Sequence, residues 1–370
     1  MNVYLDNAAT TRLDPRVLKA MGPYFTKEYG NASSLHGPGA RAKKALEQAR
    51  MVLARAINAA PEEVVFTSGG SESNNMALRG HLRGPSRKKH IIASAVEHPS
   101  VGETLRAMQE REGYKVTRIE AGPDGIVSVE DIRKAIRKDT ALVTVMHANN
   151  EFGAIQPVDL IGSLCRKKAI AFHCDCVQSL TKARIDVRKS GFTFASFSAH
   201  KLHGPKGVGA LFVRKGAFCP PLIYGGGQES GERAGTENIP GIAGFAKAIE
   251  LAQPRHIKKM MALRNRLMEG LLAIPGTALN GSKTQRLCNN VSVSFEGIKG
   301  ESLLFLLDAD GIAVSTGAAC SSAEPASVSA VRFTLSRLTT GAEIDYTIRR
   351  VTMAVRGLRK ISPAGSRYVY

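Results

Sequence analysis

The chain has 370 residues, of which 43% are hydrophobic and 22% are charged. This composition is typical of a folded protein with room for two domains, and it argues against wholesale disorder. No apolar run is long enough to cross a bilayer and the first residues do not form a secretory leader, so we expect a cytoplasmic protein without a membrane partner. The net charge of +19 fits a solvated basic surface, which we favour, or a surface for an acidic protein or nucleic acid.

Two kinds of segment alternate along the first 250 residues. Residues 45–57 and 128–138 carry apolar side chains at helical spacing. Between such helices lie β-rich apolar runs at 63–68, 90–96, 141–148, 170–178, 194–200 and 208–214. Strands that alternate with helices predict parallel pairing through helical crossovers, and hence an α/β fold with a mixed, mostly parallel sheet.

The pattern changes after about residue 250. Residues 256–274 and 343–361 have helical spacing, and between them lie the strand-like run 289–295 and the helix-like run 300–311. We therefore predict a large domain over residues 1–250 and a smaller α+β domain over residues 251–370. We expect about the first 15 residues to pack on the small domain.

Lys201 is the first candidate for chemistry. It follows the strand-like run that ends near Ser198 and precedes the loop Gly204-Pro205-Lys206-Gly207, which is where α/β sheets place their ligands. A lysine that forms a Schiff base must lose its proton easily, which requires a crowded or cationic neighbourhood. Taken alone, such a lysine is more often a surface charge.

Other polar residues also follow predicted strands. Residues 67–75 are mostly small, and they follow a strand and open a helix, so their free N–H groups offer a cradle for a phosphate. Asp175 and Gln178 end a strand-like run; a buried aspartate requires a cation such as a protonated pyridine nitrogen, or it caps a helix instead. His98 is placed to stack on a flat cofactor, although a lone histidine is more often structural.

At these positions the sequence resembles the cysteine desulfurases of the NifS/IscS type, which are class-V aminotransferase-like enzymes dependent on pyridoxal 5'-phosphate (PLP). The resemblance runs almost from end to end and implies the fold-type-I architecture of PLP-dependent transferases. The motifs that carry it include YLDNAATT, YGNASSLH, FTSGGSESNN, EHPSV, VMHANNEFGAIQP, HCDCVQS, FSAHKLHGPKGVGALFVR, GGGQESGERAGTENIP, STGAACSS and VRFTLSRLTTGAEIDYTI.

The resemblance implies a role for each candidate. Lys201 binds PLP covalently and then moves protons, Asp175 keeps the pyridine nitrogen protonated, and His98 stacks on the ring and assists proton transfer. The remaining cofactor contacts implied by the family are Gln178, Asn149, Gly70, Ser71, Ser198, His200 and, from the opposite subunit of a homodimer, Thr236.

The resemblance also implies a substrate site. Arg332 clamps the carboxylate of L-cysteine, with Asn31 and Asn149 beside it. Cys320 is the nucleophile that takes the sulfur as a persulfide and passes it to an acceptor protein; without the resemblance, a buried structural cysteine would be the commoner role. The other five cysteines lack such support, and the HCDC run at 173–176 fits small core residues better than a metal site, so we expect no metal.

The chain departs from its relatives after Cys320. Only 12 positions separate Cys320 from Arg332 (332 − 320), and the segment keeps Glu324-Pro325 but is shorter than in enzymes with a mobile catalytic loop. We therefore predict a restricted cysteine that serves a close-docking partner rather than a distant scaffold, in a dedicated pathway such as sulfur insertion into nucleic acid. For the family activity in general, the acceptor pathways are iron–sulfur clusters, thio-modification of tRNA and DNA phosphorothioation. The alternatives are a selenocysteine lyase, an aminotransferase of the same class, or a basic nucleic-acid-binding protein on this scaffold.

Overall fold

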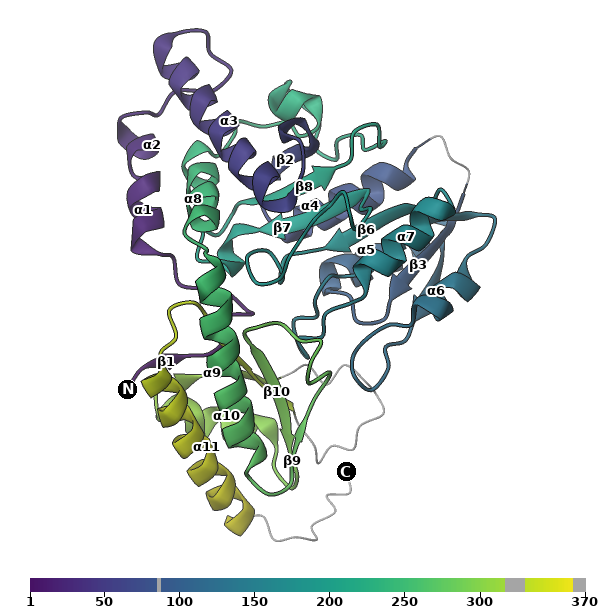
Figure 1. Cartoon of the computed structure of the whole chain (residues 1–370). Helices are drawn as coiled ribbons and strands as arrows, with labels where there is room; N and C mark the ends of the chain where they lie inside the picture. Colours follow the sequence, from purple (N-terminus) through teal and green to yellow (C-terminus); the bar gives the residue numbers. More distant parts are fainter. Residues whose placement is uncertain (85–87, 317–329, 362–370) are drawn as a thin grey trace.

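The computed structural model describes residues 1–84, 88–316 and 330–361. Figure 1 shows two parts, a large layered part and a smaller part below it that holds the C-terminal helix. Buried hydrophobic side chains form clusters on both faces of the large sheet, and a separate cluster in the smaller part includes Val3 and Leu5 together with residues 267–355.

Within the described residues, seven strands form one sheet in the order β2-β8-β7-β6-β5-β3-β4. The pairings among β3 to β7 are parallel, whereas β8 is antiparallel to both of its neighbours. The predicted α/β class and mostly parallel sheet are therefore confirmed. The strands are β2 (Val64–Thr67), β3 (His90–Ser94), β4 (Lys115–Ile119), β5 (Thr140–Thr144), β6 (Ala171–Asp175), β7 (Phe194–Ser198) and β8 (Gly209–Val213).

Strand β4 is an edge strand that the sequence pattern did not predict. Its residues KVTRI include only two apolar side chains, and Ile119 is its one buried residue. The inner strands are apolar on both faces because helices cover both sides: Ile92 and Val143 join the cluster on one face, while Ile91 and Leu142 join the cluster on the other. This double cover explains why the inner strands read as continuous apolar runs.

Helices from distant parts of the sequence cover the first face. They are α3 (Gly37–Ile57), α6 (Val129–Ala135), α7 (Val158–Lys167) and α8 (Ile239–Glu250), and α1 (Pro15–Met21) packs on α8 beside the short α2 (Pro23–Thr26). The second face is covered by α4 (Gly70–Asn75), its continuation η2 (Met76–Gly80) and α5 (Pro99–Glu112). His98 caps the first turn of α5, and Gly113 ends the helix with a left-handed φ of 71°.

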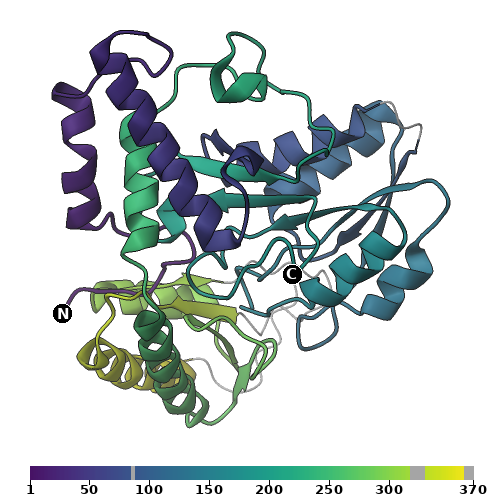
Figure 2. The ribbon, with the colours of Figure 1, turned by 45° about the horizontal axis from the view of Figure 1, so that its top comes forward.

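The smaller part is built on an antiparallel sheet of β12 (Ser315–Thr316), β13 (Ala330–Thr334), β10 (Asn290–Phe295) and β9 (Thr277–Leu279), in that order. Helices α9 (Pro254–Leu272), α10 (Gly300–Ala309) and α11 (Gly341–Ile361) pack beside it. The N-terminal β1 (Val3–Tyr4) pairs with β11 (Ile312–Ala313). The chain then runs from the smaller part towards the large one, which brings residues 6–11 between them (Figure 2).

The described helices include none that is both long and apolar enough to cross a membrane.

Candidate active site

Lys201 lies in a short 3₁₀ turn, η3 (Ala199–Lys201), directly after β7. Its Nζ donates to the backbone carbonyls of Ala8 and Ala9, at 2.5 and 2.8 Å. Burial and then the Arg332 guanidinium lower the lysine pKa to about 8, although the carboxylates of Asp175 and Asp6 oppose the shift. The amine therefore loses its proton far more easily than a surface lysine, as Schiff-base chemistry requires.

Asp175 is the last residue of β6 and is buried. Its Oδ1 accepts the N–H of Val177 at 2.9 Å, and its Oδ2 accepts the side-chain amide of Asn74 at 2.8 Å. Oδ1 thus makes the local contact typical of a capping residue. Oδ2 instead contacts Asn74 of α4, which covers the second face of the sheet. Both interpretations offered for this aspartate are compatible with its contacts.

A chain of hydrogen bonds joins Asp175 to His98. The Asn74 amide nitrogen donates to Asp175 and also to Ser100 Oγ at 2.8 Å, and Ser100 Oγ lies 2.7 Å from His98 Nδ1. Burial and the nearby Lys201 lower the pKa of His98, against the field of Asp175. The sequence reasoning missed Asn74 and Ser100, although both stand inside the motifs that carried the resemblance.

Glu97 is a second group that the sequence reasoning missed. Its Oε1 accepts from Ser94 Oγ at 2.5 Å and from the N–H of Met146 at 2.7 Å, while its Oε2 is buried without a partner among the described residues. Burial, with help from the charge of Asp175, raises the pKa of this carboxyl to about 8. At neutral pH it is therefore mostly protonated beside the aspartate.

Small residues meet at the predicted phosphate cradle. A Cβ on Gly70 would lie 2.6 Å from Cγ2 of Val177 and 3.7 Å from Cβ of Ser198, so the start of α4 approaches the ends of β6 and β7 closely. Ser198 is buried and Ser71 is exposed. His200 Nδ1 lies 3.1 Å from Thr10 Oγ1, and burial with the charge of Lys201 lowers its pKa to about 4.

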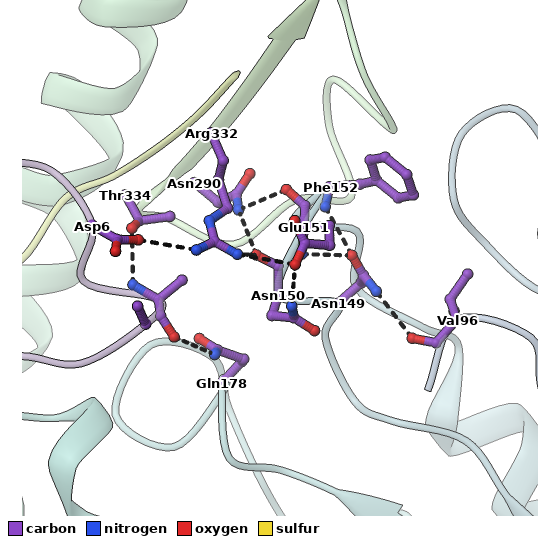
Figure 3. Close-up of polar contacts among 12 residues, drawn as sticks. Asp6, Val96, Asn149, Asn150, Glu151, Phe152, Gln178, Asn290, Arg332 and Thr334 are labelled. Carbon is purple, nitrogen blue, oxygen red and sulfur yellow. Dashed lines mark hydrogen bonds and ion pairs between the residues drawn. The ribbon is translucent and has the colours of Figure 1, made fainter. Parts of the chain in front are cut away.

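Gln178 and Asn149 are both buried, and Figure 3 draws them in one view with Arg332. Gln178 donates to the carbonyl of Ala8 at 3.0 Å, the same carbonyl that Lys201 contacts. Asn149 donates to the carbonyl of Val96 at 3.1 Å and accepts the N–H groups of Glu151 and Phe152, each at 2.8 Å. The Asn149 amide thereby fixes the turn that carries Glu151.

Arg332 enters the site from β13 of the smaller part and is buried. Its guanidinium lies between two carboxylates, with Asp6 at 2.9 Å and Glu151 at 3.1 Å, and it also donates to the Asn150 carbonyl (Figure 3). Arg332 Nε and Glu151 Oε2 are buried without partners among the described residues. The Arg332 guanidinium thus lies in the site, but Asp6 and Glu151 use part of its hydrogen-bonding capacity.

Some predicted residues are not brought to this centre within one chain. Asn31 is exposed in the loop between α2 and α3, where its side chain accepts the N–H of Ser33. Figures 1 and 2 place that loop at the opposite end of the molecule from the smaller part. Thr236 is also exposed, and the predicted nucleophile Cys320 lies outside the described residues.

Cys174 and Cys176 are buried, with their sulfur atoms 3.7 Å apart. Residues 1–84, 88–316 and 330–361 hold no group of three or more histidine, cysteine or acidic side chains arranged to bind a metal ion.

Comparison with known proteins agrees with this geometry. Residues 3–347 match the family described as aminotransferase class-V. The chain is 45% identical to a cysteine desulfurase IscS of Methanosarcina thermophila, over 98% of this chain and 94% of that protein. It is 44% identical to a probable mitochondrial cysteine desulfurase of Schizosaccharomyces pombe, over 98% and 76% of the two chains. The chain belongs to the cysteine desulfurases of the class-V aminotransferase family.

Solved structures of similar proteins share the fold of this cysteine desulfurase. A NifS-like protein superposes with a TM-score of 0.91 at 38% identity, over 96% of this chain and all of that one. A structure described as SspA in complex with cysteine superposes with a TM-score of 0.81 at 31% identity, over 92% of this chain and all of that one. The predicted family and fold are thereby confirmed.

Proposed function

We propose that this chain removes sulfur from L-cysteine with the help of PLP, with Lys201 holding the cofactor and Cys320 taking the sulfur. The observation that carries the proposal is the environment of Lys201: an amine with a pKa of about 8 placed near a buried aspartate and a buried arginine. The relatives named cysteine desulfurase and the relative solved with cysteine support the choice of substrate.

The residues of the site fit PLP. Gly70 approaches Val177 so closely that a larger residue at the start of α4 would have to displace the valine side chain, and free N–H groups there suit a phosphate. Asp175 is buried with one amide and one N–H as its partners, so it retains capacity for a protonated ring nitrogen. In this proposal Ser71, Ser198 and His200 hold the phosphate, Gln178 and Asn149 bond the ring oxygen, and His98 covers the ring.

PLP, when bound, withdraws electrons from the substrate carbons. The chain supplies the rest. Lys201 Nζ, once released from the Ala8 and Ala9 carbonyls, moves protons at the substrate, and His98 assists. Arg332 binds the substrate carboxylate, and for a bidentate contact it must give up part of its pairing with Asp6 or Glu151. Glu151 is thus a built-in competitor for the substrate.

Sulfur transfer to Cys320 balances without an added oxidant. Attack of its thiolate on the substrate sulfur breaks the C–S bond, the sulfur stays on the enzyme as a persulfide, and the former substrate carbon gains a proton and leaves as alanine. The short segment between Cys320 and Arg332, 12 positions, suits an acceptor protein that docks close to the site. The acceptor belongs to an iron–sulfur, tRNA-thiolation or DNA-phosphorothioation pathway in this proposal.

The proposal includes a homodimer. Two ion pairs attach the segment that carries Thr236 to the large part. Glu229 pairs with the buried Arg50 at 2.7 Å, and Arg233 pairs with Glu72 of α4 at 2.9 Å. Thr236 itself remains exposed. An anchored segment with an outward hydroxyl is suited to contribute to the site of a second copy, and Asn31 requires the same arrangement to reach a substrate.

The test is a comparison of the purified protein with Lys201→Ala and Cys320→Ala. We expect a visible absorbance band from bound PLP in wild type, with alanine and sulfide formed from L-cysteine under reductant. Lys201→Ala should lose the covalently bound cofactor and the activity; Cys320→Ala should keep the band and lose the persulfide. A protein that cannot be loaded with PLP would refute the proposal, and equal turnover of selenocysteine by Cys320→Ala and wild type would favour a selenocysteine lyase.

A further inference from the structure

The parallel sheet has two edges, and the candidate active site uses only one of them. Asp175 and Ser198 end β6 and β7, so the site lies at the carboxyl edge. The parallel strands begin at the opposite end of the sheet, which we call the amino edge. We define the amino edge by residues 88–89, 115, 137–138, 166–168 and 214–215. These segments carry ten positive charges from lysine and arginine.

Strand order places these segments in a row. Lys115 begins β4 and pairs in register with His90 of β3, which pairs in turn with Thr140 of β5. Residues 166–168 precede β6, and residues 214–215 follow the antiparallel β8, whose last residue Val213 pairs with Phe194 at the start of β7. Neighbouring strands lie about 4.8 Å apart, and the row crosses the five spacings from β4 to β8, so it is about 24 Å long.

The charges influence one another, which shows that they gather in space. Burial and then the charges of Arg166 and Arg188 lower the pKa of Arg214, against Glu63. At the other end, burial and then Arg137 and Lys115 lower the pKa of the buried His90. Arg166 thus lies near Arg214 at one end of the row, and Arg137 and Lys115 lie near His90 at the other.

Few carboxylates neutralise this row. The nearby Glu63 and Asp159 form ion pairs with Arg188 and Lys189, at 3.3 and 2.6 Å, and neither of these cations belongs to the amino-edge segments. Lys115, Lys138 and the Lys167–Lys168 pair are exposed and make no ion pair with the described part of the chain. Asp139 directly follows residues 137–138, and Glu63 Oε1 accepts the N–H of Lys215 at 3.0 Å. The exposed Lys115, Lys138, Lys167 and Lys168 therefore keep their positive charge for a partner.

We infer that the amino edge binds the phosphate backbone of a double-stranded nucleic acid. A row of about 24 Å that turns with the twist of the sheet covers about two-thirds of one duplex turn, and exposed lysine and arginine side chains are the groups that replace the counterions of phosphates. Tyr114 is no stacking platform for single strands, because it is buried and the Lys89 ammonium lies 4.0 Å from its ring centroid. The opposite location of the active site leaves both edges usable at once.

The test uses the holoenzyme and a labelled duplex DNA of about two helical turns. We compare wild type with Lys115→Gln/Lys138→Gln/Lys167→Gln/Lys168→Gln. The matched control is Lys43→Gln/Lys44→Gln/Lys258→Gln/Lys360→Gln, which removes four exposed positive charges elsewhere. Fluorescence anisotropy is measured between about 50 and 200 mM salt, and cysteine turnover reports that both variants are folded.

We expect the affinity of the amino-edge variant to fall about tenfold or more, and its salt slope of log K to shrink by about 0.9 for each phosphate that is no longer neutralised. The control should bind like wild type. Equally weakened binding in both variants would assign the binding to net charge and overturn the inference. So would absence of binding by wild type, or tighter binding of poly-L-glutamate than DNA at the same edge, which would indicate an acidic protein partner.

Discussion

The two edges of the large sheet use charge in opposite ways. At the carboxyl edge, Lys201 and Glu97 are hydrogen-bonded to named partners and shifted in pKa by burial: the pKa of Lys201 falls to about 8 and that of Glu97 rises to about 8. At the amino edge, lysines such as Lys138 and Lys167 are exposed and unpaired within the described chain. Burial shifts the pKa values of charged groups at the carboxyl edge, whereas exposure at the amino edge leaves positive charge available for long-range attraction.

Arg332→Gln is expected to have the largest effect. Loss of a buried cation from a hydrogen-bonded charge pair costs several kcal/mol, so kcat/KM for L-cysteine should fall about 100- to 1000-fold, mainly through KM. The loss is enlarged because Asp6 and Glu151 then face the substrate carboxylate without a cation between them. Steady-state kinetics with PLP content as a control for loading measures it.

Glu151→Gln tests whether the Glu151 carboxylate competes with the substrate carboxylate for Arg332. If Glu151 competes with the substrate for Arg332, its neutral variant should lower KM a few-fold while PLP content stays at the wild-type level. A rise in KM comparable to that of Arg332→Gln would show instead that Glu151 is required to hold the guanidinium in place.

The pKa of Lys201 predicts a pH dependence. Only the unprotonated amine can bond to PLP, so the rate of PLP incorporation into the apo-protein should rise about tenfold per pH unit and level off above about 8. Because Arg332 is the largest charged contributor to the lowered pKa, Arg332→Gln should move the midpoint to higher pH. A surface-exposed control, Lys206→Ala, should leave it unchanged; a midpoint near the ordinary lysine value in wild type would contradict the prediction.

The sequence predicted the carboxyl edge better than its inner contacts. Lys201, Asp175 and His98 could be named as candidates because each follows an apolar strand in a motif that resembles a known family, and their roles stay predictions. Glu97 and Asn74 could not be found from their spacing, because their roles depend on neighbours such as Met146 and Ser100 that only the folded chain brings near. The weakly apolar β4 was missed because an edge strand buries only one residue fully.

At the amino edge, the charged residues could be recognised from the sequence, but their arrangement in space could not. Its clusters of lysine and arginine were plain in the sequence, but whether they converged on one face could not be seen there. Convergence follows from the parallel pairing of β3, β5, β6 and β7, which brings the segments before each strand to the same side. Topology, a non-local property, therefore decided what local composition could not.

Glu97→Gln should have a moderate effect that depends on pH. The folded pKa of about 8 lies above the unfolded value of 4.5, so between these values the folded state binds more protons than the unfolded state. Stability therefore falls as pH rises from about 5 to 8, by at most about 1.4 kcal/mol per unit. Glutamine cannot titrate, so the thermal midpoint of the variant should decline less over this range. Parallel declines would show that Glu97 is ionised throughout.

The smallest effect is expected from charge removal at the amino edge. Lys167→Gln and Lys168→Gln each remove an exposed side chain that makes no ion pair with the described residues, and surface changes of this kind usually alter stability by less than about 0.5 kcal/mol. Both variants should therefore keep the thermal midpoint and the cysteine turnover of wild type, measured side by side with Glu97→Gln. A loss of turnover without a change in the thermal midpoint would show that the two edges are coupled, because a solvated cation far from the reacting atoms has no direct means of changing their chemistry.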